Sequence, residues 1–200
     1  MLVPRQILNL ILRRPKMNKK KWSFWTRNVK DEFKSLSAKE IQETLQKTCF
    51  DYAVLMEHWH GDFNISTMVR NANAFNAKEV FYIGKKKWDR RGAVGTHHYT
   101  PLKHLNALED VLTLKERYTF VAFDNNVEKN DIMKLDDFDW NRLEKPPLMI
   151  FGEEGEGVTS TLLEWSDYVV EIPQYGSVRS LNVGTSSGIV MYDYTNKIRR

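Results

Sequence analysis

Residues 172–182 read Ile-Pro-Gln-Tyr-Gly-Ser-Val-Arg-Ser-Leu-Asn, and they stand between an apolar strand-like run and a long helix-like run. α/β proteins place their ligands in such loops, between the carboxyl end of a buried strand and the start of a helix. Pro173 and Gly176 are typical of a tightly turning backbone. Ser180 and Asn182 present a hydroxyl and an amide beside the free N–H groups of the first helical turn. The segment therefore predicts a ligand-binding loop, with a serine N-cap on an ordinary helix as the alternative.

Outward from this loop, short apolar runs alternate with stretches of helical spacing. The predicted strands are residues 52–56, 80–83, 119–123, 148–151 and 168–172, and the predicted helices are residues 38–47, 64–75, 105–118, 159–165 and 181–197. Nearly all-apolar strands that alternate with helices favour a mostly parallel sheet with helices on both faces. We therefore expect an α/β fold, with a basic loop at 84–100 and an acidic surface excursion at 124–146.

The net charge of +4 is unevenly distributed along the chain. Residues 1–34 hold ten Lys or Arg residues and two acidic residues, which gives +8, so residues 35–200 carry −4. We predict a basic N-terminal arm at 1–34 and one folded domain at 35–200. Within the arm, Trp22, Phe24 and Trp25 lie among the cations, a pattern that favours contact with RNA. The alternatives are an organellar transit peptide and an upstream extension with a later Met as the working start.

The cysteine and histidine content limits the classes of site that the chain can build. Cys49 is the single cysteine, which excludes a disulfide framework and a cysteine-rich zinc site. A reducing compartment suits this usage, so we expect a cytoplasmic protein. His97 and His98 are adjacent and lack a ligand partner at metal-binding spacing, so we expect no metal. Residues 7–12 are too short an apolar run to span a bilayer, and we expect no membrane partner.

Two segments upstream could share a site with the loop at 172–182. Asn64 is suited to cap the predicted helix at 64–75, and Arg70 lies nearly two turns further along, although a solvated helix arginine is the ordinary interpretation. Residues 152–157 read Gly-Glu-Glu-Gly-Glu-Gly. Their carboxylates would repel a phosphate, and no Gly-Lys-Ser/Thr pattern follows. The turn therefore favours a cationic ligand such as S-adenosylmethionine (SAM), with a solvated acidic turn as the alternative.

Taken in order, these segments resemble the three motifs of the SpoU/TrmH family, which are SAM-dependent RNA ribose 2'-O-methyltransferases of the SPOUT superfamily. The matching residues are Asn64 and Arg70, then Gly152, Glu154 and Gly157, then Ile172, Pro173, Ser180, Leu181, Asn182 and Val183. The resemblance covers residues 50–197 and is nearest to the tRNA guanosine-2'-O-methyltransferase branch. It implies the SPOUT fold, with a deep trefoil knot at the C-terminal end, and a homodimer formed through the knot region.

The resemblance also implies roles for individual residues. The catalytic set that it implies is Arg70, supported by Asn64, Glu154, Ser180 and Asn182. The set that it implies for holding SAM is Gly152, Glu154, Gly157, Ile172, Leu181 and Asn182. Arginine is a poor general base because its pKa exceeds about 12, so we expect Arg70 to orient groups and to stabilise charge.

A basic loop at 85–91 is the predicted RNA contact, because it holds five cations beside a tryptophan. Its cations are Lys85, Lys86, Lys87, Arg90 and Arg91. We expect RNA as the partner, with tRNA favoured over rRNA. Two other hypotheses stay open: a non-catalytic RNA-binding module, and a phosphate-binding α/β enzyme, which the acidic turn disfavours.

Overall fold

The structure is a computed structural model that describes residues 28–60, 63–125, 127 and 132–198. The chain forms two units, Met1–Leu36 and Ser37–Arg200. In the first unit the described residues hold one short 3-10 helix, η2 (Asp31–Phe33). The predicted contact of Trp22, Phe24 and Trp25 with RNA lies outside the described residues. Everything that follows concerns the second unit.

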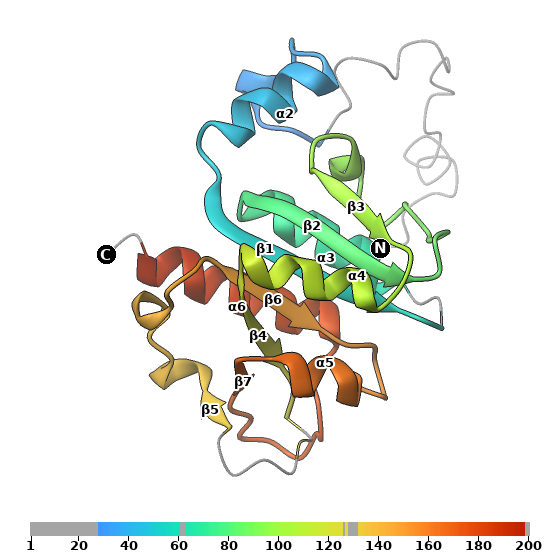
Figure 1. Ribbon diagram of the computed structural model, residues 1–200. Coiled ribbons are helices and arrows are strands. Elements are labelled where there is room, and N and C mark those ends of the chain that lie inside the picture. The colour runs from blue at the N-terminus through green and yellow to red at the C-terminus, as the bar shows by residue number, and fades with distance from the viewer. Residues whose placement is uncertain (1–27, 61–62, 126, 128–131, 199–200) are drawn as a thin grey trace, which may run out of the picture. The chain divides into compact units, whose positions relative to one another are not determined.

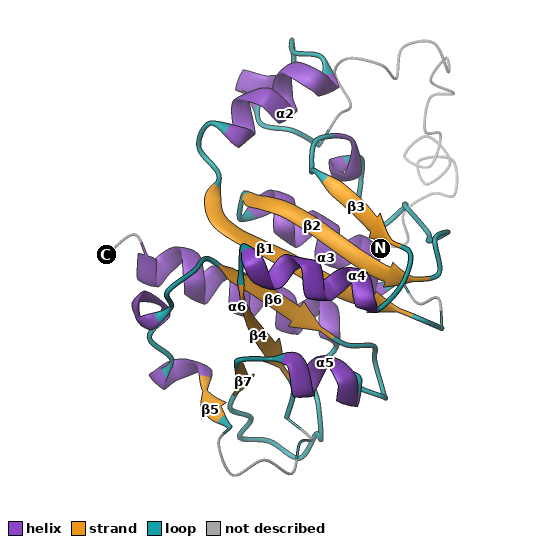
Figure 2. Ribbon diagram, in the orientation of Figure 1, coloured by secondary structure: helices purple, strands orange, loops and turns teal. Residues whose placement is uncertain are grey.

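A parallel sheet forms the centre of the second unit (Figures 1 and 2). Within the described residues its strands are β1 (Phe50–His58), β2 (Ala77–Gly84), β3 (Leu102–Leu105), β4 (Thr119–Phe123), β5 (Met133–Lys134), β6 (Pro147–Phe151) and β7 (Tyr168–Glu171). They are ordered β3-β2-β1-β6-β4-β7-β5, and each neighbouring pair is parallel. The central strands β1, β4 and β6 are almost wholly buried, which explains their nearly continuous apolar sequence.

Helices cover both faces of this sheet, as Figure 2 shows. The α-helices are α2 (Ala38–Gln46), α3 (Asn64–Ala74), α4 (Glu109–Leu112), α5 (Ser160–Trp165) and α6 (Val183–Ile198). The 3-10 helices beyond η2 are η3 (Thr96–His98), η4 (Thr113–Glu116), η5 (Leu135–Asp137) and η6 (Trp140–Arg142). Successive side chains of β1 point to opposite faces, so Val54 packs in the cluster that contains α3 and α6. Leu55 packs in the other cluster, with residues of α4 and α5.

Helices α3 and α6 lie in close contact because α6 presents small residues to α3. The Asn71 side chain of α3 donates hydrogen bonds to the Gly184 carbonyl at 2.8 Å and to Ser187 Oγ at 3.0 Å. A Cβ at Gly184 would meet Thr67 Cγ2 at 2.9 Å, and one at Gly188 would meet Asn71 Nδ2 at 3.2 Å. A side chain at Gly184 would therefore force the helices or Thr67 to shift, and one at Gly188 would have to displace the Asn71 amide slightly.

The predicted α/β fold is confirmed, and each of the five predicted strands lies within or overlaps an observed one. The predicted helix at 105–118 is wrong at its start, because β3 runs to Leu105. The Asp110 carboxylate accepts hydrogen bonds from the Asn106 and Ala107 N–H groups at 2.9 and 3.0 Å, and this turn separates strand from helix. None of the helices in the described part of the chain has the length and apolar content needed to cross a bilayer.

The prediction of a surface excursion at 124–146 is also wrong. Leu135, Phe138 and Trp140 are buried in the core cluster on the α6 side of the sheet. Trp140 Nε1 donates to Asp193 Oδ2 of α6 at 2.8 Å, and Lys197 Nζ donates to the Leu135 carbonyl at 2.8 Å. Asp136, Asp137, Asp139 and Glu144 are exposed while Leu135, Phe138 and Trp140 turn inward, so composition alone was misleading.

We predict that Trp140→Ala lowers the free energy of unfolding by about 3–5 kcal/mol, because it empties a buried aromatic site and removes the hydrogen bond to Asp193. Urea denaturation followed by far-UV circular dichroism measures the change. Glu144→Ala, at an exposed position nearby, is the matched control and changes stability by less than about 0.5 kcal/mol. Equal stability of the two variants would contradict the buried position of Trp140.

Candidate functional site

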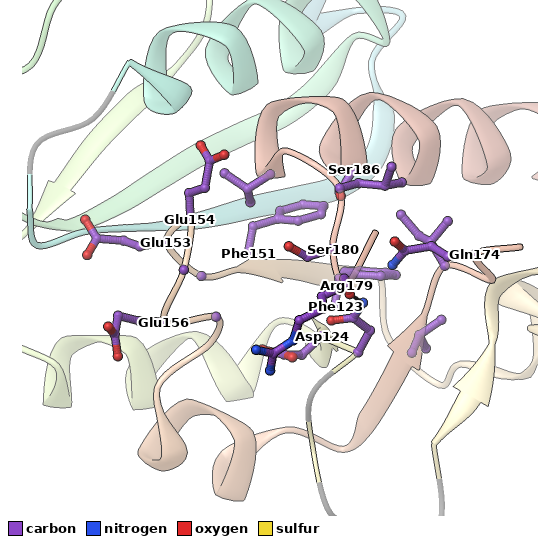
Figure 3. A pocket seen from close by; sticks show the side chains of 18 residues that line it. Phe123, Asp124, Phe151, Glu153, Glu154, Glu156, Gln174, Arg179, Ser180 and Ser186 are labelled. Atoms are coloured by element: carbon purple, nitrogen blue, oxygen red, sulfur yellow. Dashed lines mark hydrogen bonds between the residues drawn. The ribbon is translucent and has the colours of Figure 1, made fainter. Parts of the chain in front are cut away.

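A cavity of about 330 Å³ opens at the carboxyl ends of β4, β6 and β7 (Figure 3). Three loops enclose it: Asp124 and Asn125 after β4, residues 152–157 after β6, and residues 172–183 after β7. Because parallel strands end at one edge of a sheet, loops far apart in the sequence meet there. The structure thus joins the second and third predicted motifs in a single cavity.

Apolar side chains form part of the cavity wall, and polar groups of the three loops form the rest. Phe123 and Phe151 stack with their ring centroids 5.2 Å apart, and Val170, Ile172 and Val183 also line the space. Polar residues that line it are Asp124, Asn125, Glu153, Glu154, Glu156, Gln174, Arg179 and Ser180 of the loops and Ser186 in the first turn of the helix α6. Apolar walls combined with a few placed polar groups are typical of small-molecule sites.

The turn at 152–157 is closed by hydrogen bonds between its own ends. The Glu153 N–H donates to the Gly157 carbonyl at 3.1 Å, and the Gly157 N–H donates to the Glu153 carbonyl at 3.0 Å. A Cβ at Gly152 would lie 1.9 Å from the Gly157 carbonyl oxygen. Gly157 has φ +73°, and a Cβ there would meet Asp124 Oδ2 at 2.4 Å. Both glycines are therefore required by close approach of backbone to backbone and of backbone to Asp124.

One residue from each predicted motif meets in a hydrogen-bonded group, which we name the Asn–Glu–Asn triad: Asn64, Glu154 and Asn182. The Asn182 amide donates to Asn64 Oδ1 at 2.8 Å and to Glu154 Oε2 at 3.0 Å. Asn64 Nδ2 donates to the same Glu154 oxygen at 2.8 Å. The triad links the start of α3, the glutamate turn and the start of α6.

Asn182 is also the N-cap of α6. Its Oδ1 accepts a hydrogen bond from the Thr185 N–H at 3.2 Å, and its backbone carbonyl accepts one from the Ser186 N–H at 2.9 Å. The helix begins at Val183, two residues later than expected. The alternative of a serine N-cap is wrong, because Asn182 caps the helix, and the ligand-binding role of the loop stays a prediction.

Asn64 and Arg70 occupy places that the sequence did not fully predict. Asn64 is the first residue of α3 and does not cap it, since Phe63 holds the cap position without a side-chain hydrogen bond. Arg70 lies about 120° around the helix from Asn64, given 3.6 residues per turn. It is exposed and outside the cavity lining, and none of the hydrogen bonds or ion pairs among the described residues involves its side chain. Its catalytic role stays a prediction.

The basic loop at 85–91 lies beside the first turn of α3. All five of its cations are exposed, and Lys85 Nζ donates to the His60 carbonyl at 2.9 Å. Arg90 lies over the Trp88 ring, with 5.8 Å to the centroid. A Cβ at Gly92 would meet Ser66 Oγ of α3 at 2.1 Å, so the loop and the helix touch. The predicted RNA contact is thus beside the helix that carries Asn64.

Five polar cavity residues were not singled out from the sequence: Asp124, Asn125, Ser186 and, within the predicted ligand loop, Gln174 and Arg179. Asp124 and Asn125 directly follow the predicted strand at 119–123, so the rule that selected the other loops could have found them. Asp124 Oδ2 accepts a hydrogen bond from the Val158 N–H at 2.8 Å, and the Asn125 side chain donates to the Arg179 carbonyl at 2.7 Å. These contacts join the three loops to each other.

Two buried carboxylates, Glu57 and Glu153, connect the glutamate turn and the residues after it to β1 and the loop that follows β1. Glu153 accepts a hydrogen bond from the His60 N–H at 2.7 Å, and its other oxygen contacts the His60 ring. Glu57 accepts hydrogen bonds from Trp59 Nε1 at 2.9 Å and from the Thr159 N–H at 2.8 Å. Burial raises the pKa of Glu57 above its ordinary value, and the nearby charge of Glu153 adds to the shift.

Comparison with protein families matches residues 51–192 to the family described as the SpoU rRNA Methylase family. The tRNA (guanosine(18)-2'-O)-methyltransferase of Aquifex aeolicus is 28% identical over 161 residues, which are 78% of this chain and 74% of that protein. The family match includes each of the three segments that form the cavity and the triad.

Solved structures share the fold. The A. aeolicus TrmH/SpoU tRNA modifying enzyme aligns with a TM-score of 0.68 and 24% identity, covering 81% of this chain and 82% of that one. The SpoU methyltransferase AviRb from Streptomyces viridochromogenes, solved in complex with the cofactor AdoMet, aligns with a TM-score of 0.65 and 23% identity. That alignment covers 74% of this chain but 58% of AviRb, less than two thirds of its length.

The raised pKa of Glu57 gives a pH prediction whose sign follows from linkage. Below pH 4.5 the carboxyl is protonated in both states. As the pH rises, the unfolded chain releases its proton first, so the free energy of unfolding falls until the folded chain also ionises. Relative to Glu57→Gln, which cannot titrate, the wild type therefore loses stability as the pH rises above 4.5.

Urea denaturation of both proteins from about pH 4 to pH 8 measures this difference, because pH effects shared by both proteins cancel. Glu144→Gln, at an exposed position, serves as the matched control. A pH-independent difference between wild type and Glu57→Gln would contradict the raised pKa.

Proposed function

Because this chain belongs to the SpoU rRNA methylase family, we propose that it transfers a methyl group from SAM to a ribose 2'-hydroxyl of RNA. The observation that carries the proposal is the Asn–Glu–Asn triad, since it brings one residue from each motif into direct contact and its Glu154 lines the cavity. A guanosine of tRNA is the favoured substrate, because the relative from A. aeolicus carries that activity in its name. An rRNA ribose is the alternative.

The cavity suits SAM by its size, its walls and its charge. Its volume of about 330 Å³ falls in the range of small-molecule sites. Phe123, Phe151 and Ile172 offer apolar surface to a purine ring, and the turn at 152–157 offers carboxylates to a sulfonium or ammonium group. Among the described residues that line the cavity, Arg179 supplies positive charge for a carboxylate. The resemblance implies that the ligand is held at Gly152, Glu154, Gly157, Ile172, Leu181 and Asn182, and all of these except Asn182 line the cavity.

When bound, SAM supplies a methyl group on a sulfonium: transfer forms the bond from the ribose oxygen to the methyl carbon, breaks the bond from carbon to sulfur, and leaves a neutral thioether. Orienting the ribose hydroxyl could contribute about 7–11 kcal/mol of barrier lowering. General base catalysis adds about 10²–10⁴-fold. Orienting the hydroxyl therefore lowers the barrier more than general base catalysis does. We assign this orientation to the triad and to Ser180, which lines the same cavity as Glu154.

We assign Arg70 the task of steering the ribose and its neighbouring phosphate, and of stabilising the charge that develops on the 2'-oxygen. Its exposure leaves the guanidinium free to contact RNA. A guanidinium has a pKa too high for an efficient base, so the proton passes to an acceptor such as an RNA phosphate or water. The cations of the loop at 85–91 hold the RNA backbone alongside.

We further propose a C-terminal trefoil knot and a homodimer. Support for the knot is the hydrogen bond from Asn125 to the Arg179 carbonyl, which joins the connection after β4 to the connection after β7. If the knot is present, pulling the chain from its two ends gives an extended length short of about 3.3–3.6 Å per residue.

Support for the homodimer is exposed apolar surface at Val178, Ile189 and Tyr192. A monomer mass in sedimentation equilibrium would contradict the homodimer.

The function is tested by incubating the protein with labelled SAM and bulk RNA from cells that lack it, then mapping the ribose methylation. We expect label in tRNA at a ribose 2'-oxygen. A non-catalytic RNA-binding module would bind this RNA without labelling it. Stabilisation by ATP but not by SAM in a thermal-shift assay would favour a phosphate-binding enzyme.

In the same assay we predict that Arg70→Ala lowers methyl transfer by about 10²-fold or more, since it removes a charge placed near the reacting oxygen. The dissociation constant for SAM stays unchanged, because Arg70 lies outside the cavity. Lys47→Ala, at an exposed position on another element, is the control. Transfer retained within a few-fold in Arg70→Ala would remove Arg70 from the mechanism.

A further inference from the structure

Phe63 is a large aromatic side chain left exposed next to the triad. Its exposed fraction is 63%, which is high for a phenylalanine. It directly precedes Asn64, whose side chain donates to Glu154. Consecutive Cα atoms are about 3.8 Å apart, so the backbone of Phe63 adjoins that of a triad residue. Neither the fold nor the triad uses this ring.

The guanidinium of Arg91 lies over the Phe63 ring, with 5.7 Å to the centroid. Asp89 holds that guanidinium through a two-pronged contact: Arg91 Nε donates to Asp89 Oδ2 at 2.8 Å, and Nη2 donates to the same oxygen at 2.5 Å. The Arg91 N–H also donates to Asp89 Oδ1 at 2.9 Å. Asp89 thereby fixes the Arg91 guanidinium in place, where it can make a cation–π contact with the Phe63 ring.

Tight packing fixes the loop of Arg91 against the turn that carries Phe63. Ser66 Oγ donates to the Phe63 carbonyl at 2.8 Å, and Gly92 lies so near Ser66 that a Cβ would meet its Oγ at 2.1 Å. The aromatic ring and the guanidinium are therefore held together by the fold before any ligand arrives. Such a preformed flat surface lowers the entropy that binding must overcome.

We propose that Phe63 is the stacking platform for the base of the nucleotide whose ribose is methylated. The ligand is an unpaired nucleobase, displaced from its neighbours in a single-stranded loop of RNA. This inference rests on the proposed function and adds to it how the target nucleotide is held. A base is attached directly to its ribose, so stacking on Phe63 keeps the sugar beside the Asn–Glu–Asn triad.

The lysine contacts with phosphate and the Phe63 contact with a base should then differ in how they depend on salt. Lys85, Lys86 and Lys87 are exposed cations that contact phosphates, and such contacts weaken as salt rises. The Phe63 ring is neutral, so stacking on it depends little on salt. Every base has an aromatic face, so Phe63 selects for an unpaired base and not for the identity of the base.

Steady-state methylation of bulk RNA, taken from cells that lack the protein, tests the proposal with variants at Phe63. Phe63→Ala and Phe63→Leu raise KM for RNA by about 5- to 150-fold, the range found when a base loses an aromatic partner. Phe63→Tyr and Phe63→Trp stay within about threefold of the wild type, because they keep an aromatic face. The KM for SAM stays unchanged in all four, since Phe63 is outside the cavity lining.

Leu112→Ala, at another exposed apolar position, is the matched control and leaves KM for RNA unchanged. A salt titration of RNA binding separates the two kinds of contact. Phe63→Ala keeps the wild-type slope of log affinity against log salt, whereas the triple change Lys85→Gln, Lys86→Gln and Lys87→Gln flattens it.

The proposal is overturned if Phe63→Leu binds RNA as well as the wild type does, or if Phe63→Ala changes the salt slope as the lysine variants do. Loss of thermal stability in Phe63→Ala would also count against it, because an exposed platform should not carry the fold. These outcomes differ from failure of the proposed function, in which the wild type itself transfers no methyl group to RNA.

Discussion

The site depends on how one amide uses its hydrogen-bonding capacity. The two N–H groups of Asn182 reach Asn64 and Glu154, while its oxygen caps the helix that follows. Three segments that are far apart in the sequence are thereby fixed to one another by a single side chain. A shorter or charged side chain at this position could not satisfy all of these partners at once, because each uses a different atom or direction of the amide.

Helix α6 connects this amide to the far side of the core. Its first turn is capped by Asn182, and its last turn holds Lys197, whose ammonium donates to the carbonyl of Leu135. Between these ends Trp140 and Asp193 join the helix to the segment after β5. The site loops are therefore anchored to the hydrophobic core and not only to one another, which favours a preorganised cavity.

The buried strands could be predicted from the sequence because nearly continuous apolar runs are typical of strands covered on both faces. Strands β3 and β5 were missed, since they are short, lie at the edges of the sheet and carry polar residues. The order of the motifs identified the members of the triad, but no spacing in the sequence encodes contact between residues 118 positions apart. The Phe63 ring was missed for a related reason, since its partner Arg91 reaches it only when two loops are brought together by tertiary packing.

The glycines where α6 meets α3 have a consequence for how relatives of this protein can diversify. Gly184 packs against Thr67 and Gly188 against Asn71, so the distance between the two helices is set by these contacts. That distance in turn sets how far Asn64, at the start of α3, lies from Asn182, at the start of α6. Substitution at these glycines would disturb the packing of the two helices, whereas the exposed loop at 85–91 can change its side chains without such a cost. New RNA preferences in such a scaffold should therefore arise by rewriting the loop, while the helix pair is inherited unchanged.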